Sequence, residues 1–547
     1  MKRIIILSAM FLAAVFSAAA QNLDPTVEVS RRYEGKLIDV HKPAMEMAVP
    51  DSVYMFDLYF DYSVFDNPYK GSYEFNPYTM DMKPESHPVT PSVFYLNAGA
   101  GYTLHPLLDV LYSPVQKGAF NMDIYGTHRS YIGDYRNVHV GGQPAGGYFK
   151  SGYDILSKAG ADMGYDWSNV SLDFGASYYG VALKDDFKKD DYNSVKAYLD
   201  LKSKAVDQFM YGVGMSYRYG NEGALNEHLF DLDAKVSHAF RFNSRIEVGF
   251  GVDFGVYAGG ADVVFGNFHV LPRYVYENGR FRSSVGARVS AVTSQSEGFS
   301  KANQFIYPDI RLSYDVIKNA MRLYLNVKGG ETLNTYHSVL DRNHHAALSY
   351  ALEGKNLLGS SIERIHPEIG FDGRISSFFS YSVKGGYLLS DNALMNVLVS
   401  EGAGYRPALG YSSYQQGYAG ADFTLSFESF RCDGAFTYAH TWGQDQLTAG
   451  SYVVLPSEFK AQLSAVCNWN KRVYVGADCE FASKARTVQE DIYLPYSIDL
   501  GAYAEYVINK NISVWLKGGN LLDMEIQRTP LFAEKGLNFT AGICLNF

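Results

Sequence analysis

The last eleven residues decide the fold: Leu537-Asn538-Phe539-Thr540-Ala541-Gly542-Ile543-Cys544-Leu545-Asn546-Phe547. Every odd position carries an apolar side chain, and every even position carries a small or polar one. Successive side chains point to opposite faces of a β-strand, so this period of two predicts a strand with one apolar face. A chain that stops on such a strand, with an aromatic terminal residue, is typical of bacterial outer-membrane barrels. We expect Phe539, Ile543, Leu545 and Phe547 to form the signal that the outer-membrane assembly machinery reads.

The amino terminus predicts export. Lys2 and Arg3 form a basic region, residues 4–16 are apolar, and residues 18–20 are alanines suited to cleavage. The apolar stretch is short for a membrane span, which disfavours an uncleaved anchor. We therefore expect residues 1–20 to be a signal peptide for Sec export, with Gln21 as the first residue of the mature chain.

The composition favours a membrane β-barrel over a soluble enzyme. Aromatic residues make up 15% of the 547 residues and charged residues only 19%, below the usual quarter. No stretch after the signal peptide is long and apolar enough for a transmembrane helix, as expected of a barrel that spreads its apolar residues one in two. The net charge of -10 argues against nucleic acid as a partner. Cys467 and Cys479 are expected to be free thiols facing lipid, with a disulfide between them as the alternative.

The alternation recurs along the whole chain. From Ile246 to Val256 the even positions are apolar, whereas the odd positions are Glu, Gly or Asp. Residues 230–242 show the same division. An uninterrupted apolar face opposite a charged face describes a wall between outer-membrane lipids and water. The predicted lumen-facing residues are Asp231, Asp233, Lys235, Arg241, Glu247 and Asp253.

Short polar turns alternate with longer loops, which is the rhythm of outer-membrane barrels. Ten short turns, the first at Leu104-His105, predict twenty strands between about residues 91 and 522. The closing strand and Val53 to Ser63, taken as the first strand, raise the number to about 22, with 20 or fewer as the alternative. The predicted fold is therefore all-β, a large transmembrane antiparallel barrel over residues 53–547. Residues 21–52 form an expected periplasmic segment, and residues 65–90 a possible inserted loop.

The C-terminal fifth of the chain resembles the TonB-dependent receptors. In that family an Asn-Leu-x-Asp turn, a loop containing Pro and Gly, and a terminal strand ending in Phe follow an aromatic-rich strand. Here the turn reads Asn520-Leu521-Leu522-Asp523, Pro530 and Gly536 follow it, and Phe547 ends the chain. The resemblance implies a barrel of 22 strands in the bacterial outer membrane.

The front of the chain departs from that family, whose members place a globular plug of well over a hundred residues before the barrel. About 30 residues separate Gln21 from the first candidate strand, so we expect no plug domain. Thr26-Val27-Glu28-Val29 is similar to the family's energy-coupling box, an extended segment that can pair with TonB. We favour a plain flexible periplasmic tail as the interpretation of this segment, with the energy-coupling box as the alternative.

Two functions remain open at this point. The barrel passes a solute or polymer, with a lid lipoprotein, TonB or other outer-membrane subunits as partners, or it is a non-transporting scaffold within a larger assembly. An outer-membrane enzyme is a distant third, because the chain has neither a GxSxG motif nor a P-loop. His337, Asp341, His344 and His345 lie in one long loop without a typical zinc spacing. We therefore expect no catalytic residue, metal site or cofactor.

Overall fold

The computed structural model describes residues 93–547 apart from 103, 116–117, 135–137, 145–150, 185–188, 205–208, 241–242, 260–262, 297–298, 319, 343–358, 403 and 446–448. Several predictions therefore lie outside the described residues: the signal peptide, the segment 21–52, Thr26 to Val29, Val53 to Ser63, the insert 65–90 and Arg241. No helix within the described part of the chain is long and apolar enough to cross a membrane.

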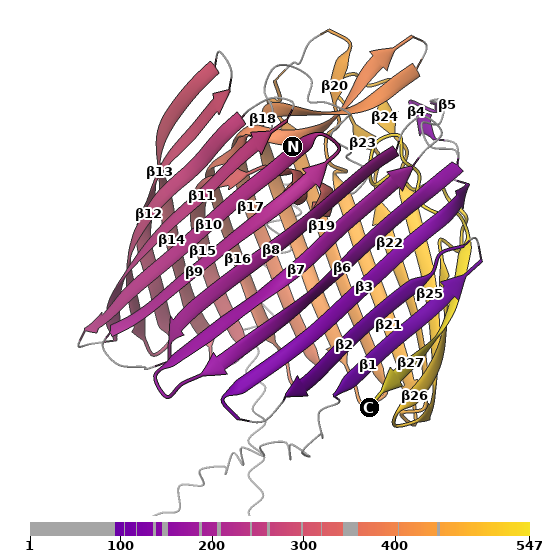
Figure 1. Cartoon of the computed structure of the whole chain (residues 1–547), viewed down its shortest axis with the longest axis horizontal. Helices are drawn as coiled ribbons and strands as arrows, with labels where there is room; N and C mark the ends of the chain where they lie inside the picture. The colour runs from indigo at the N-terminus through magenta and orange to yellow at the C-terminus, as the bar shows by residue number, and fades with distance from the viewer. Residues whose placement is uncertain are drawn as a thin grey trace, which may run out of the picture. The chain divides into compact units, whose positions relative to one another are not determined.

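Within the described residues, twenty-two antiparallel strands form a closed barrel, as the sequence predicted (Figure 1). The strands are β1 (Phe94–Gly101), β2 (Leu107–Val115), β3 (Phe120–Asp134), β6 (Ser151–Asp166), β7 (Val170–Lys184), β8 (Lys189–Ser203), β9 (Phe209–Glu222), β10 (Leu225–Phe240), β11 (Ser244–Ala258), β12 (Val263–Asn278), β13 (Phe281–Ser296), β14 (Phe299–Ile317), β15 (Met321–Leu333), β16 (Ser360–Arg374), β17 (Phe379–Glu401), β18 (Gly404–Ser426), β19 (Phe430–Trp442), β21 (Phe459–Trp469), β22 (Val473–Ala482), β25 (Ser497–Asn509), β26 (Ile512–Gly519) and β27 (Asn538–Asn546). Each pairs with the next, and β27 closes the ring by pairing with both β26 and β1.

The ring reaches 22 strands by a route that differs from the predicted one. Because β1 starts beside the carboxyl terminus, the break at Leu104-His105 lies at the opposite end of the barrel from the other short turns. The missing short turn follows Val115, where Gly118 takes a φ of +104°. The missed turn joins β2 to β3, so β3 is the strand that the sequence count lacked, and the ring closes entirely within Phe94–Asn546. We call the end that holds Phe547 the turn end, and the other the loop end.

The outer surface of the barrel is apolar. Along β9 the odd positions from Tyr211 to Tyr219 are 37–46% exposed, while the glycines and polar residues between them face the lumen. The even positions of β11 from Ile246 to Phe250 are equally exposed. An apolar surface that encircles the barrel is stable only where lipid covers it.

A short helix packs against the inner wall near the loop end. Helix α2 (Tyr336–Arg342) belongs to the connection between β15 and β16. Its Tyr336, Val339 and Leu340 are buried in a hydrophobic core with inward-facing residues of five strands. These are Tyr179, Val181, Leu183, Tyr192, Leu229, Tyr257, Val263 and Phe265.

A second core joins the long connections above the barrel, which we call the loop cap. It contains Val138, Val140, Leu398, Val454, Ile492, Leu494, Leu531 and Ala533. Strands β17 and β18 have 23 residues each, far more than the 9–11 that span a bilayer, so their hairpin extends into the cap. There Val397–Val399 pairs with β20 (Ser451–Val453). In Figure 1 the small strands β4 (His139–Val140), β5 (Gln143–Pro144), β20, β23 (Ala485–Arg486) and β24 (Tyr493–Leu494) gather at this end.

Candidate functional site

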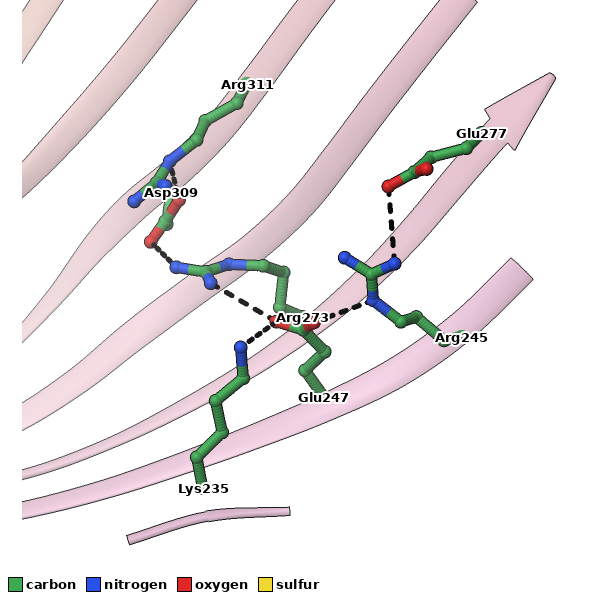
Figure 2. Close-up of polar contacts among 7 residues, drawn as sticks. All are labelled: Lys235, Arg245, Glu247, Arg273, Glu277, Asp309 and Arg311. Atoms are coloured by element: carbon green, nitrogen blue, oxygen red, sulfur yellow. Dashed lines mark hydrogen bonds and ion pairs between the residues drawn. The ribbon is translucent and has the colours of Figure 1, made fainter. Parts of the chain in front are cut away.

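A buried carboxylate organises the inner wall near the turn end. The side chain of Glu247 is 6% exposed and lies between three cationic groups (Figure 2). It accepts Lys235 Nζ at 3.0 Å, Arg245 Nε at 2.8 Å and Arg273 Nη1 at 3.5 Å. The register explains the contacts, because Ser237 and Arg273 lie directly opposite Glu247 on β10 and β12. Glu247 is therefore shared by three cationic side chains that the strand pairing brings to it.

The network continues across the neighbouring strands (Figure 2). Arg273 Nη2 donates to Asp309 Oδ2 at 2.5 Å, and Arg311 Nε lies 3.4 Å from the other oxygen of the same carboxylate. Arg245 Nη1 lies 3.2 Å from Glu277 Oε1. We call the group Lys235, Arg245, Glu247, Arg273, Glu277, Asp309 and Arg311 the wall network. It ties β10 to β14 on the lumen side, where the backbone ladder alone does not fix side chains.

A cavity of about 1000 Å³ opens on the inner wall beside the wall network, between β8 and β12. Five of the predicted lumen-facing residues line it: Asp231, Asp233, Lys235, Glu247 and Asp253. The cavity also contains Asp200, Lys202, His269 and Arg273, which were not among the predicted lumen-facing residues. The same period of two marks them, since each lies directly across from a lumen-facing position of β9 or β11.

Helix α2 is held at its first residue by a buried carboxylate on the wall. Glu227 is 1% exposed and accepts hydrogen bonds from Tyr257 Oη at 2.6 Å, Tyr192 Oη at 2.8 Å and the Tyr336 amide at 2.9 Å. At the other end of the helix, Lys158 Nζ lies 2.8 Å from Asp341 Oδ1. Of the loop residues weighed as metal ligands, His337 and Asp341 thus serve the docking of α2, and His344 and His345 lie outside the described residues.

Acidification is expected to weaken the docking of α2. Burial, together with nearby Arg218, lowers the pKa of His337 from 6.5 to about 3, against the opposing effect of Asp341. The unfolded chain takes up this proton below about pH 6.5 and the folded chain only near pH 3, so the stability contributed here falls as the pH drops through that window. The variant His337→Phe keeps a ring against Tyr179, which lies 4.6 Å away between centroids, but cannot titrate.

The measurement is the thermal midpoint of the purified protein between pH 7.5 and 4. The wild type should lose more stability over that range than His337→Phe, because all other titrating groups are common to both. Equal losses in the two proteins would contradict the expected role of His337.

The turn that resembles the TonB-dependent receptors has a structural role. Asn520 and Asp523 adopt positive φ values of 45° and 53°. The Asn520 side chain donates to Met524 O at 2.8 Å and Lys535 O at 3.0 Å, and accepts from Met524 N at 2.9 Å. Asp523 Oδ1 accepts the Leu537 amide at 2.9 Å. The two residues therefore join both ends of the connection 520–537 just before the closing strand.

Replacing Asn520 with alanine should destabilise this connection by about 1–3 kcal/mol, because Asn520 is 3% exposed and its partly buried backbone partners would lose their bonds. Limited proteolysis in the region 520–537 measures the effect. Asn511→Ala is a suitable comparison, since its side chain donates to the exposed carbonyl of Asn546. Equal protease resistance of the two variants would contradict the role of Asn520.

The predicted assembly residues form one row that follows β27 and ends at Phe547, the residue after the strand. Phe539, Ile543 and Phe547 are 39–56% exposed on the lipid-facing side, and Leu545 lies in the same row opposite Leu96 of β1. Their recognition by the assembly machinery stays a prediction. Cys432, Cys467, Cys479 and Cys544 are free thiols, and Cys467 is exposed on that outer side.

Comparisons with known proteins find chains with a similar fold, but no match by sequence. No protein-family model matches the chain, and no curated protein matches it. A solved copper transporter, OprC, is 10% identical with a TM-score of 0.62 over 84% of this chain and 81% of its own. The ferric-catecholate import receptor Fiu of K12 E. coli is 10% identical with a TM-score of 0.62 over 83% and 82%.

The pyoverdine receptor FpvA of Pseudomonas aeruginosa PAO1, bound to pyoverdine, is 10% identical with a TM-score of 0.63 over 84% of this chain and 79% of its own. Identities this low show a shared fold alone. The closed ring of 22 strands in the described part of the chain is thus a receptor-like barrel, the fold that these solved structures share. The expected lack of a plug concerns residues before Val93, outside the described part of the chain.

Proposed function

We propose that this chain is an integral outer-membrane barrel, exported through Sec, that passes a solute or polymer across the outer membrane. The single observation that supports the proposal is the division of the wall: an apolar surface outside, and a cavity of about 1000 Å³ beside a charged network inside. Such a wall separates the lipid around the barrel from the water in its lumen. The similar solved structures, named as transporters and import receptors, support the same direction.

The proposal includes a partner that closes the lumen. A barrel of 22 strands without a plug would leave a wide channel, which argues for a lid lipoprotein, a separate plug or other outer-membrane subunits. Coupling to TonB through Thr26 to Val29 is part of the proposal. Deleting residues 22–32 tests it: solute uptake should fall if the segment engages TonB, and unchanged uptake would remove TonB from the proposal.

Planar-bilayer conductance of the purified full chain tests passage directly. Stepwise channels of large conductance are expected if the lumen conducts once a partner is removed. A barrel that inserts, as judged by protease protection, but never conducts would overturn the proposal.

A scaffold role in a larger outer-membrane assembly is the second candidate. The loop cap favours it, because four long connections share one core, as in a rigid platform. Stable subunits that co-purify with a non-conducting barrel are the result expected of a scaffold. Large channels would argue against that role.

A further inference from the structure

The wall cavity is built from two adjacent rows of opposite charge. In the first, which we call the lysine row, the register places Lys202, Gly212, Lys235, Gly249 and Leu271 side by side from β8 to β12. In the next, the aspartate row, it places Asp200, Gly214, Asp233, Gly251 and His269 side by side. The rows lie two residues apart along each strand, roughly 6.5–7 Å.

Glycines hollow the wall between the charged side chains. A Cβ atom added at Gly212 or Gly249 would meet no atom closer than 3.7 Å, and neither residue has a positive φ. Neither packing nor backbone conformation therefore requires glycine at these two positions. Because these two glycines have no side chains, the space on both sides of Lys235 stays open, and both residues line the cavity.

The polar groups of the cavity can still donate or accept further hydrogen bonds. In the described part of the chain, Asp200, Asp233 and Asp253 make no ion pair, and Asp231 accepts a bond from Ser216 at 2.7 Å. The ammonium of Lys235 has three donors and uses one on Glu247, while its side chain stays 57% exposed. Ser237, which also lines the cavity, is 3% exposed, and its Oγ has no hydrogen-bond partner among the residues that the structure describes.

We propose that this cavity binds a small zwitterion, an amino acid or a short peptide, with its ammonium on the aspartate row and its carboxylate on the lysine row. The proposal rests on the proposed passage of solutes, since it names the class of solute that the lumen wall recognises. An extended dipeptide spans roughly 6.6–7.2 Å, which matches the spacing of the two rows. A purely anionic or cationic solute would satisfy one row and face like charge on the other.

Isothermal titration of the purified full chain in detergent tests recognition without requiring passage. The probe is dialanine with both termini free, compared with acetyl-dialanine, dialanine amide and acetyl-dialanine amide. Free dialanine should bind saturably and at least 10-fold more tightly than any blocked form. Alanine and trialanine, added in parallel, show whether an amino acid or a longer peptide fits the site better.

Two variants remove the features that carry the proposal. Asp200→Asn with Asp233→Asn neutralises the aspartate row, and Gly212→Leu with Gly249→Leu fills the open space on both sides of Lys235. Each pair should weaken dialanine binding at least 10-fold. The matched controls are Asp422→Asn on β18, which lies outside this cavity, and Gly420→Leu on the same strand, and both should change binding less than 2-fold.

The outcomes separate this inference from the proposed passage. Equal affinity for the free and fully blocked peptides, or binding unaffected by both double variants, overturns the zwitterion site even if the barrel conducts. Selective binding that both double variants abolish supports the zwitterion site. This support holds even if the barrel does not conduct, because that result would overturn only the proposed passage of solutes. A filled variant that no longer folds is replaced by Gly212→Ala with Gly249→Ala, which should weaken binding in the same direction.

Discussion

Deleting residues 537–547 should abolish the folded barrel. The deletion exposes the paired edges of β1 and β26, and a row of unsatisfied amides and carbonyls cannot be placed in lipid. The expected result is the loss of a heat-modifiable band on SDS gels and of protease resistance. A truncated chain that still forms a protease-resistant barrel would contradict closure by β27.

Phe547→Ala separates backbone closure from the side-chain signal. Phe547 O accepts from Val93 N at 2.6 Å and Phe94 N at 2.9 Å, and Phe547 N donates to Phe94 O at 2.8 Å. The substitution keeps all three bonds, so the variant should refold in detergent like the wild type. It should nevertheless insert more slowly in cells if the terminal ring is the assembly signal. Equal insertion rates would remove Phe547 from that signal.

The second large effect is expected at Glu247. Replacing it with glutamine leaves Lys235, Arg245 and Arg273 without their shared acid, and two of the three are 34–57% exposed in the lumen. Because water can screen those two charges, we expect a loss of about 1.5–3 kcal/mol rather than the 3–5 kcal/mol of a fully buried pair. Urea unfolding in detergent measures the loss.

Asp433→Asn is the matched control, because Asp433 pairs with Arg431 at 2.8 Å while both side chains are at least 40% exposed. An exposed pair of this kind contributes about 0–1 kcal/mol. The reversal potential in a salt gradient is a second measurement. Without the Glu247 carboxylate, the cationic side chains around it should make the Glu247→Gln channel more selective for anions. Equal stability of the two variants would contradict the central place of Glu247 in the wall network.

Much of the barrel could be predicted from the period of two alone. The pattern assigned Ile246 to the lipid face and Asp253 to the lumen side, and it identified the closing strand. The turn count was less reliable because a turn signal does not say at which end of the barrel the turn lies. One missed turn after Val115 therefore moved the first strand from β1 to Val53–Ser63.

Helix α2 and the wall network could not be predicted in the same way. A helix of seven residues has little stability of its own and forms here by packing on Leu229 and Phe265. The sequence does contain a signal for the helix. The inward-facing residues Asp231 and Asn267 are polar, whereas Leu229 and Phe265, the next inward-facing residues toward the loop end on the same strands, are apolar. The ion pairs of Glu247 depend on the register of three strands, which no single segment specifies.

The loop cap sets a constraint on the order of folding. His139 and Glu525 are 386 positions apart, yet the His139 amide donates to Glu525 Oε1 at 2.8 Å. Contacts of such separation carry a large loop-closure cost until the ring has brought its first and last strands together. The cap should therefore condense last, after β27 meets β1, so that its formation reports a completed barrel. A chain stalled during insertion would show its long connections to proteases, whereas a finished one would not.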